Sequence, residues 1–276
     1  MDYIQVSFNI EPTEPGTEIL IAELSLLDFE SFEETEQGVK AFIPEDQFKE
    51  PEIQEIEQRL SDVFTISSSF ETIKFTNWNA VWESNYEPVL IKDSVYIYTP
   101  FHSEKKDVKF PILIEPKMSF GTAHHETTSL VIEMMLGLDF QNQEVLDMGC
   151  GTGVLAILAE KMGASQLDAI DNDSNAFENA EENVKNNNCT HINVQMGSAE
   201  QIKNNYDCII ANINKNILLA DMDKYSGHLN HKGSIIFSGF YSNDLENIEA
   251  QANICGLSLD RFLEKNRWVA AKFDKQ

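Results

Sequence analysis

The stretch "VLDMGCGTGVLAIL", from Val145 to Leu158, decides the fold. An apolar run ends in an acid, glycine then occupies every second place, and an apolar run with helical spacing follows. A glycine turn between a strand and its helix is typical of parallel α/β sheets that bind nucleotide-like ligands at the helix amino terminus. We therefore expect a bound molecule to come close to the backbone at Gly149, Gly151 and Gly153.

Strands and helices alternate regularly on both sides of this stretch. The apolar runs predict strands at 144–149, 166–171, 192–197, 206–213 and 233–240, and helices at 127–138, 154–163, 175–187, 216–229 and 243–256. The tail 257–273 reads as two strands with a turn at Lys265–Asn266. Alternation of this kind predicts an α/β, Rossmann-like, seven-stranded sheet that is covered by helices on both faces.

The first seventy or so residues have a different pattern. Strands are expected at 3–10, 38–44 and 65–73, with helices at 17–34 and 50–64, which predicts a small α+β, ferredoxin-like domain. It has no cluster of catalytic residue types, so we interpret it as a recognition or packing module. The predicted domains are 1–74 for substrate recognition, 75–115 for a linker and connecting strands, and 116–276 for catalysis. Trp78 and Trp82 in the linker predict a hydrophobic anchor, or alternatively an aromatic cage for an alkylated amine.

Composition limits the class of protein. The chain has 276 residues and 42% apolar residues, and neither a signal peptide nor a membrane span is recognisable. None of the four cysteines forms a CxxC pair, so we expect a cytoplasmic protein without structural zinc. A net charge of −26 argues against direct binding of nucleic acid. This charge serves either solubility or the attraction of a basic partner. A monomer is expected.

Two acids identify the ligand class. The dinucleotide fingerprint requires a third glycine where this chain has Val154, and Asp147 before the turn would repel a pyrophosphate. Asp171 follows Gly149 by 22 residues, near the spacing at which a carboxylate holds ribose hydroxyls. A ligand with a ribose and a positive centre but no phosphate is S-adenosylmethionine. The alternative is that Asp171 only caps the next helix, although Asp173 and Ser174 are better placed for that.

The segment from Asn77 to the C-terminus resembles the bacterial methyltransferases that modify large-subunit ribosomal protein eleven, the stalk-base protein. Three motifs carry the resemblance: "MSFGTAHHETT" (118–128), "LDMGCGTGVLAI" (146–157) and "CIIANINKNILL" (208–219). The first is similar to that family's Phe-Gly-Thr-Gly-x-His-x-Thr-Thr loop, which generic methyltransferases lack. The chain departs from this loop at Ala123, where many members have glycine. The order of small domain, Trp-containing linker and methyltransferase domain is similar too.

The resemblance implies a set of site residues. Thr128 would touch the cofactor, and Asn212 would lie beside the transferred methyl group as the catalytic residue. Ser198 stands where many methyltransferases carry an acid that faces the adenine amine. The predicted cofactor-binding residues are therefore Thr128, Asp147, Gly149, Gly151, Gly153, Asp171, Ser198 and Asn212, and no metal ligand is expected. His124 and His125 would either accept the amine proton or close the loop by hydrogen bonding.

The resemblance also implies a class I, S-adenosylmethionine-dependent protein methyltransferase. It would methylate lysine side chains and an N-terminal amine of a basic ribosomal protein, which the acidic first domain would capture. The side-chain carbonyl of Asn212 suits an amine because it accepts a hydrogen bond without formal charge. Two alternatives stay open: a methyltransferase of this class with another protein or small-molecule amine as substrate, and a ribosome-binding adaptor without chemistry. Val154 and Asp147 disfavour an NAD oxidoreductase.

Overall fold

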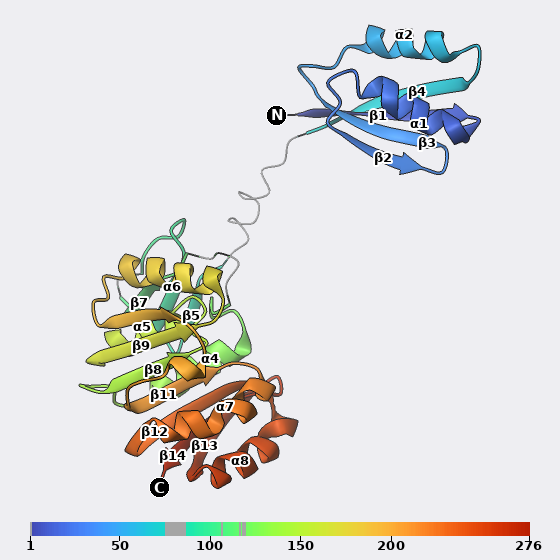
Figure 1. The fold of residues 1–276 in the computed structure, drawn as a ribbon. Coiled ribbons are helices and arrows are strands. Elements are labelled where there is room, and N and C mark those ends of the chain that lie inside the picture. The colour runs from blue at the N-terminus through green and yellow to red at the C-terminus, as the bar shows by residue number, and fades with distance from the viewer. Residues whose placement is uncertain (1, 75–86, 106, 116, 118–119) are drawn as a thin grey trace. The chain divides into compact units, whose positions relative to one another are not determined.

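A computed structural model describes residues 2–74, 87–105, 107–115, 117 and 120–276 (Figure 1). Contacts between residues divide the chain into two compact units, residues 1–85 and residues 86–276. The two tryptophans at 78 and 82 lie outside the described residues, so their roles stay predictions. In the part of the chain that is described, no helix is both long and apolar enough to cross a membrane.

The small unit is a four-stranded antiparallel sheet with two helices. Its elements are β1 Tyr3–Glu11, α1 Thr13–Leu24, β2 Ser31–Thr35, β3 Gly38–Pro44, α2 Glu50–Leu60 and β4 Thr65–Ile73. The strand order is β2-β3-β1-β4, and apolar residues of both helices share one core with β1 and β3. Element order and strand order are those of a ferredoxin-like sandwich. The sequence predicts this class of domain with three strands, and β2 is the strand that the prediction lacks.

One element of the small unit differs from the prediction. The helix expected at 17–34 ends at Leu24, and Ser31–Thr35 forms the edge strand β2. Of the five residues of β2, none is buried, and Phe32 and Thr35 are half-buried. The strand therefore lacks the strong apolar alternation by which strands are recognised in a sequence.

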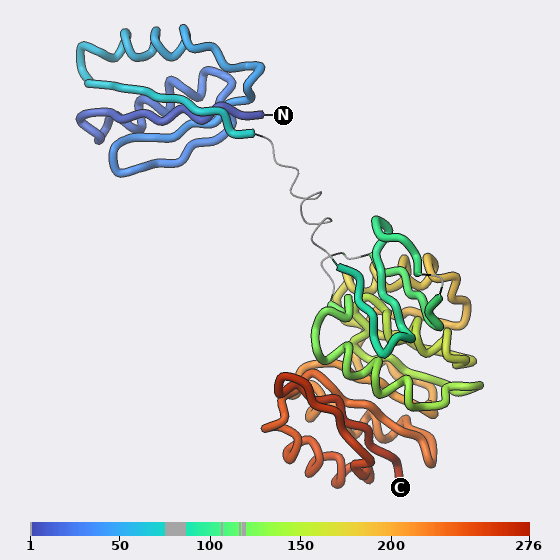
Figure 2. Tube along the Cα trace, turned by 180° about the vertical axis from the view of Figure 1, so that it is seen from behind, coloured from blue at the N-terminus to red at the C-terminus, as the bar shows by residue number. Residues whose placement is uncertain are grey.

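The larger unit is built on a seven-stranded sheet with the order β10-β9-β8-β11-β12-β14-β13. Its strands are β8 Glu144–Met148, β9 Gln166–Asp171, β10 Ile192–Met196, β11 Tyr206–Asn212, β12 Leu229–Tyr241, β13 Leu257–Lys265 and β14 Trp268–Lys275. The strands from β10 to β12 are parallel, and β14 runs antiparallel to both β12 and β13. In both ribbon and tube views the dark red C-terminal hairpin lies beside orange β12 (Figures 1 and 2).

Helices cover both faces of this sheet. They are α4 Glu126–Met135, α5 Val154–Lys161, α6 Ser174–Asn186, α7 Lys215–Gly227 and α8 Leu245–Ile254, with short 3₁₀ helices η1 Ala199–Gln201 and η2 Ser242–Asp244. Sheet residues alternate between two cores, so that Val145 packs with α4 and α5 while Leu146 packs with α7. This alternation is the pattern of a sheet that is buried on both sides, and it confirms the predicted Rossmann-like class.

A smaller three-stranded sheet belongs to the same unit. It consists of β5 Val89–Ile91, β6 Val95–Tyr98 and β7 Phe110–Leu113, in the order β5-β6-β7. Buried residues such as Ile97 and Ile112 share the core that contains α4 and α5. These strands are therefore part of the larger unit, whereas the domain limits at 74 and 115 stay predictions.

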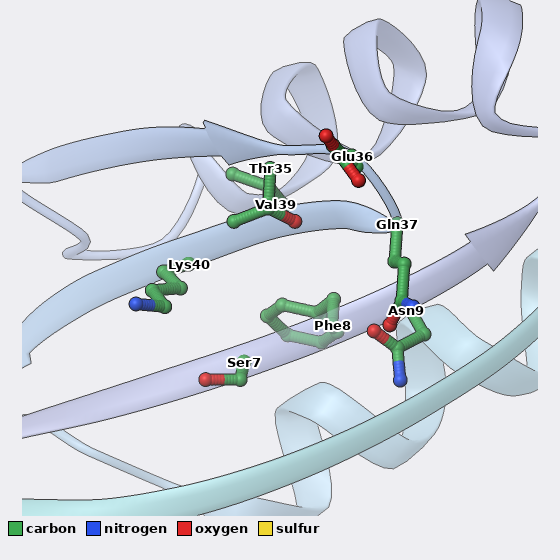
Figure 3. A pocket seen from close by; sticks show the side chains of 8 residues that line it. All are labelled: Ser7, Phe8, Asn9, Thr35, Glu36, Gln37, Val39 and Lys40. Atoms are coloured by element: carbon green, nitrogen blue, oxygen red, sulfur yellow. The ribbon is translucent and has the colours of Figure 1, made fainter.

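A shallow hollow of about 290 Å³ lies on the small unit, between β1 and the β2–β3 hairpin (Figure 3). Its lining residues are Ser7, Phe8, Asn9, Thr35, Glu36, Gln37, Val39 and Lys40. Lys40 lies 3.9 Å from Glu33, so its charge has a partner. Hydroxyls, amides, one carboxylate and a paired lysine are the composition of a surface rather than of a reaction site.

Candidate functional site

A cavity of about 490 Å³ opens at the carboxyl ends of β8, β9, β11 and β12. The chain leaves β8 toward β9 on one side and leaves β11 toward β12 on the other, so the cavity lies at a topological switch point, where doubly wound sheets bind ligands. It is lined by Phe120, His125, Thr127, Gly149, Gly151, Asp171, Asn172, Asp173, Ala176, Asn212, Ile213, Asn214, Ile217, Gly239 and Trp268.

The glycine turn forms one wall. Gly149 and Gly151 have positive φ angles of 72° and 54°, which glycine adopts at low cost. A Cβ atom would overlap the Ile213 side chain at Gly149 and the Phe120 carbonyl at Gly151. The sequence predicts that a bound molecule comes close to the backbone at these glycines. In the structure, the groups that lie against Gly149 and Gly151 belong to Ile213 and Phe120, which also line the cavity.

Asp171 is the acid at the end of β9 and lies in the cavity. Its Oδ2 accepts a hydrogen bond of 2.9 Å from the Gly151 N–H, and its Oδ1 accepts one of 3.0 Å from the Asp173 N–H. The N-cap of α6 is Asp173, whose Oδ1 accepts from the Asn175 N–H at 2.8 Å. The alternative that Asp171 merely caps this helix is therefore wrong.

Asp147 lies beneath the turn rather than in the cavity wall. It is 1% exposed, and its Oδ2 accepts a 3.1 Å hydrogen bond from the Ala156 N–H. Its Oδ1 is buried without a hydrogen-bond partner among the described residues. Burial raises the pKa of this carboxyl from 3.8 to about 7, the Ala156 N–H opposes the rise, and the charge of Asp171 adds to it.

Asn212 ends β11 and reaches the start of α4. Its Nδ2 donates a 3.2 Å hydrogen bond to Oγ1 of Thr128, which is 1% exposed. Thr127, the neighbour of Thr128, is the threonine that lines the cavity. Thr128 thus fixes the orientation of the Asn212 amide, and its own contact with a ligand stays a prediction.

Gly153 and Ser198 do not line the cavity. Gly153 is the N-cap of α5, and a Cβ there would lie 3.4 Å from Ala180 of α6, so the residue allows close helix packing. Ser198 precedes η1, and its backbone N–H and hydroxyl both bond to Oε1 of Gln201. Gly153 therefore acts through helix packing, Ser198 bonds locally at the start of η1, and contact of either residue with a cofactor stays a prediction.

The histidines of the first motif also have partners. His125 is the N-cap of α4, with Nδ1 2.8 Å from Oγ1 of Thr127. His124 has Nε2 2.8 Å from the Glu87 carbonyl oxygen and Nδ1 3.2 Å from Oγ1 of Thr122. Both side chains are therefore hydrogen-bonded to neighbouring groups, and the two roles that the sequence left open stay predictions.

An aromatic rim, formed by Phe120, His125, Tyr241 and Trp268, is the feature that sequence reasoning missed. The His125 and Trp268 rings lie 4.8 Å apart edge to face, and the Tyr241 and Trp268 rings lie 4.0 Å apart. Phe120 completes the rim at 6.0 Å from His125. The feature of the sequence that could have revealed this rim is the predicted terminal hairpin, because its second strand pairs with β12 and places Trp268 opposite Tyr241.

In the described ranges, no group of three or more His, Cys, Asp or Glu residues is placed to hold a metal ion.

The seven-stranded sheet with its antiparallel final hairpin, the glycine turn after the central strand and the acid after the next strand define a class I methyltransferase. The sequence model of the family described as ribosomal protein L11 methyltransferase (PrmA) matches residues 9–276. The chain therefore belongs to this family.

Individual relatives agree with this assignment. The chain is 40% identical over 279 residues to ribosomal protein L11 methyltransferase of Phocaeicola vulgatus, with 99% of both chains covered. It is 39% identical over 283 residues to the protein of that name from Porphyromonas gingivalis, with coverage of 99% of this chain and 98% of the other. The crystal structure of ribosomal protein L11 methylase from Lactobacillus delbrueckii subsp. bulgaricus superposes with a TM-score of 0.64 at 29% identity, over 69% of this chain and 100% of that one.

Proposed function

We propose that this protein transfers methyl groups from S-adenosylmethionine to lysine and N-terminal amines of ribosomal protein L11. The observation that carries the proposal is the 490 Å³ cavity in which the glycine turn, Asp171 and Asn212 meet. Membership of the L11 methyltransferase family supports both the reaction and the protein substrate.

The residues around the cavity fit a cofactor with a ribose and a positive centre. Asp171 keeps acceptor capacity on both oxygens beyond its bonds to Gly151 and Asp173, and ribose hydroxyls can use it. Asp147 offers a buried carboxylate oxygen without a hydrogen-bond partner among the described residues, close to the same turn. When bound, S-adenosylmethionine supplies an electrophilic methyl carbon on a sulfonium. Among the described residues that line the cavity, none is a lysine or an arginine that could pair with a pyrophosphate.

The amine is held at the other end of the cavity. Thr128 engages Nδ2 of Asn212, so the side-chain carbonyl oxygen of Asn212 is the group that accepts a hydrogen bond from the amine. The aromatic rim excludes water from the alkyl chain that carries the amine. Orientation of the amine and exclusion of water together lower the activation barrier by several kcal/mol, which is on the order of the reduction known for well-aligned reactants. Ser198 remains a predicted adenine contact, and Gly153 acts through helix packing.

The test is incubation of the purified protein with S-adenosylmethionine and L11, followed by mass spectrometry of L11. The mass of L11 should rise by whole methyl increments, on lysine or N-terminal amines. Asp171→Asn should weaken cofactor binding about tenfold to a hundredfold, because charged hydrogen bonds to the ribose are lost, each of about 1.5–3 kcal/mol. Asp139→Asn is the matched control, since the Asp139 carboxylate also accepts a hydrogen bond from the N–H two residues further on, that of Gln141, and Asp139 does not line the cavity.

Three results would count against the proposal. If L11 stays unmodified in the presence of folded protein and cofactor, L11 is not the substrate. Methyl transfer to another protein of a ribosomal extract would replace L11 as the substrate. Absence of any heat on titration with S-adenosylmethionine would favour an adaptor without chemistry.

We further propose that the small unit captures L11 and that the reaction takes place in the cytoplasm, the compartment of ribosome synthesis. Residues 1–74 carry eighteen acidic and only four basic side chains. Such a surface attracts a basic protein and repels nucleic acid. We expect the protein to act as a monomer.

A further inference from the structure

Two asparagines of α6 and the C-cap asparagine that follows it face the chain that leads into the first motif. Asn179, Asn183 and Asn187 follow one another at intervals of four residues and so share one face of the helix. Asn187 pairs with both backbone groups of Leu113, accepting from the N–H at 3.0 Å and donating to the carbonyl at 2.6 Å. The free edge of β7 is thus paired by side-chain amides instead of by another strand.

The next residue of this edge to be held is Glu115. Its N–H donates to Oδ1 of Asn183 at 2.8 Å, and its carbonyl accepts from Nδ2 of Asn179 at 3.2 Å. Asn183 is 0% exposed, so water does not compete for its amide. α6 therefore fixes the point at which the chain leaves β7 for the first motif.

Asn183 makes a second hydrogen bond that has no counterpart at Asn187, the next asparagine on this face. Its Nδ2 donates at 3.0 Å to the carbonyl of Thr152, inside the glycine turn. Thr152 is also 0% exposed, and its other two polar groups point to the first motif. Its N–H donates to the Phe120 carbonyl at 2.9 Å, and its hydroxyl donates to the Gly121 carbonyl at 2.8 Å.

We infer that Asn183 and Thr152 form a positioning relay for methyl transfer. Neither residue lines the cavity, but together they tie Glu115, Phe120 and Gly121 to the glycine turn. The relay fixes the position of Phe120 relative to Gly151. These two residues line the cavity from different segments of the chain. The inference rests on the proposed function, since it states how that site is kept assembled.

A purely structural role makes a different prediction. If Asn183 only stabilised the fold, its loss would resemble the loss of Asn187. The Asn187 amide makes two hydrogen bonds to Leu113 and one to the Asn183 carbonyl, but none to Thr152. Asn187→Ala is therefore the matched control for Asn183→Ala. Thr152→Val removes the hydroxyl bond to Gly121 with almost no change of shape and retains the backbone bonds, so it is the variant most certain to fold.

The experiment compares these three full-length variants with the unchanged protein. We expect Asn183→Ala and Thr152→Val to lower kcat for L11 methylation about tenfold, because small displacements of an aligned site are costly, while KM for S-adenosylmethionine changes about threefold or less. Asn187→Ala should lower the melting temperature about as much as Asn183→Ala and leave kcat unchanged. Without cofactor, amide hydrogen exchange in the peptide 120–128 should accelerate in the first two variants only.

The outcomes separate the relay from the proposed function. Equal losses of kcat and equal exchange in the Asn183→Ala and Asn187→Ala variants would overturn the relay while the methyltransferase proposal stands. Failure of the unchanged protein to methylate L11 would overturn the proposed function, and the exchange comparison would still decide whether Asn183 and Thr152 hold the segment. A double variant whose loss of kcat is smaller than the two single losses combined supports one shared relay.

Discussion

At the scale of single residues, Asp147 couples the proposed cofactor site to protons. Its carboxyl is buried, one oxygen has no hydrogen-bond partner among the described residues, and burial raises its pKa to about 7. A cation bound at the glycine turn favours the ionised form. Below that pKa, binding of S-adenosylmethionine must therefore release a proton, and the affinity must rise as the pH approaches 7.

We expect calorimetric titration near pH 6, about one unit below that pKa, to give an apparent enthalpy that depends on the ionisation enthalpy of the buffer. Asp147→Asn should remove this dependence, because asparagine has no carboxyl group to release a proton. The pH dependence of stability has the opposite sign to the pH dependence of cofactor affinity. Because the folded-state pKa is raised, the unfolding free energy should fall as the pH rises from about 4 to about 7, and this fall should be smaller in Asp147→Asn. Identical buffer dependence in both proteins would contradict the assignment.

At the scale of secondary-structure elements, Asp168 links three strands of the sheet. Its buried carboxylate accepts bonds from Asn193 Nδ2 at 2.7 Å, Gln195 Nε2 at 2.8 Å, Asn204 Nδ2 at 3.0 Å and the Tyr206 hydroxyl at 2.7 Å. The donors belong to β10, to β11 and to the turn before β11. Burial, together with the Asp168 carboxylate, raises the pKa of Tyr206, which keeps this donor protonated.

Tyr206→Phe should lower the unfolding free energy by about 1.5–3 kcal/mol, the usual range for a hydrogen bond to a charged group. Asp168→Asn should lower the unfolding free energy more than Tyr206→Phe does, because the new amide nitrogen would face two hydrogen-bond donors. Chemical denaturation measures both effects. S-adenosylmethionine affinity is the control and should not change, since Tyr206 begins β11 and the cavity lies at the other end of that strand, beside Asn212. A weakened affinity in Tyr206→Phe would contradict this separation.

The elements also explain which parts of the fold the sequence could predict. Buried parallel strands such as β8 and β11 are mostly apolar, and a glycine turn or an asparagine marks where each ends. β2 was missed because both of its faces are largely exposed and no apolar period marks it. Asp171, predicted from its spacing after the glycine turn, and Asn212, implied by the family resemblance, both line the cavity, and their roles stay predictions. Trp268 was missed because only the long-range pairing of β14 with β12 brings it to the cavity.

At the scale of the whole molecule, the chain consists of two units with separate cores. The small unit has its own apolar cluster around Val6 and Leu20, and every residue that lines the cavity lies between Phe120 and Trp268. Each unit should therefore fold alone. The division of charge is just as clear, because eighteen of the forty-six acidic side chains fall within residues 1–74 beside only four of the twenty basic ones.

Deletion of residues 1–74 should therefore separate two properties of the protein. S-adenosylmethionine affinity should be retained in calorimetry, because the cavity is intact, whereas binding of L11 should weaken. In the full chain, L11 binding should also weaken as salt is added, since exposed charges are screened beyond about 8 Å at physiological ionic strength. The isolated small unit should bind L11 with the same salt dependence. If the truncated chain and the full chain bind L11 equally well at low salt, the acidic unit has no part in capture, and its charge serves solubility instead.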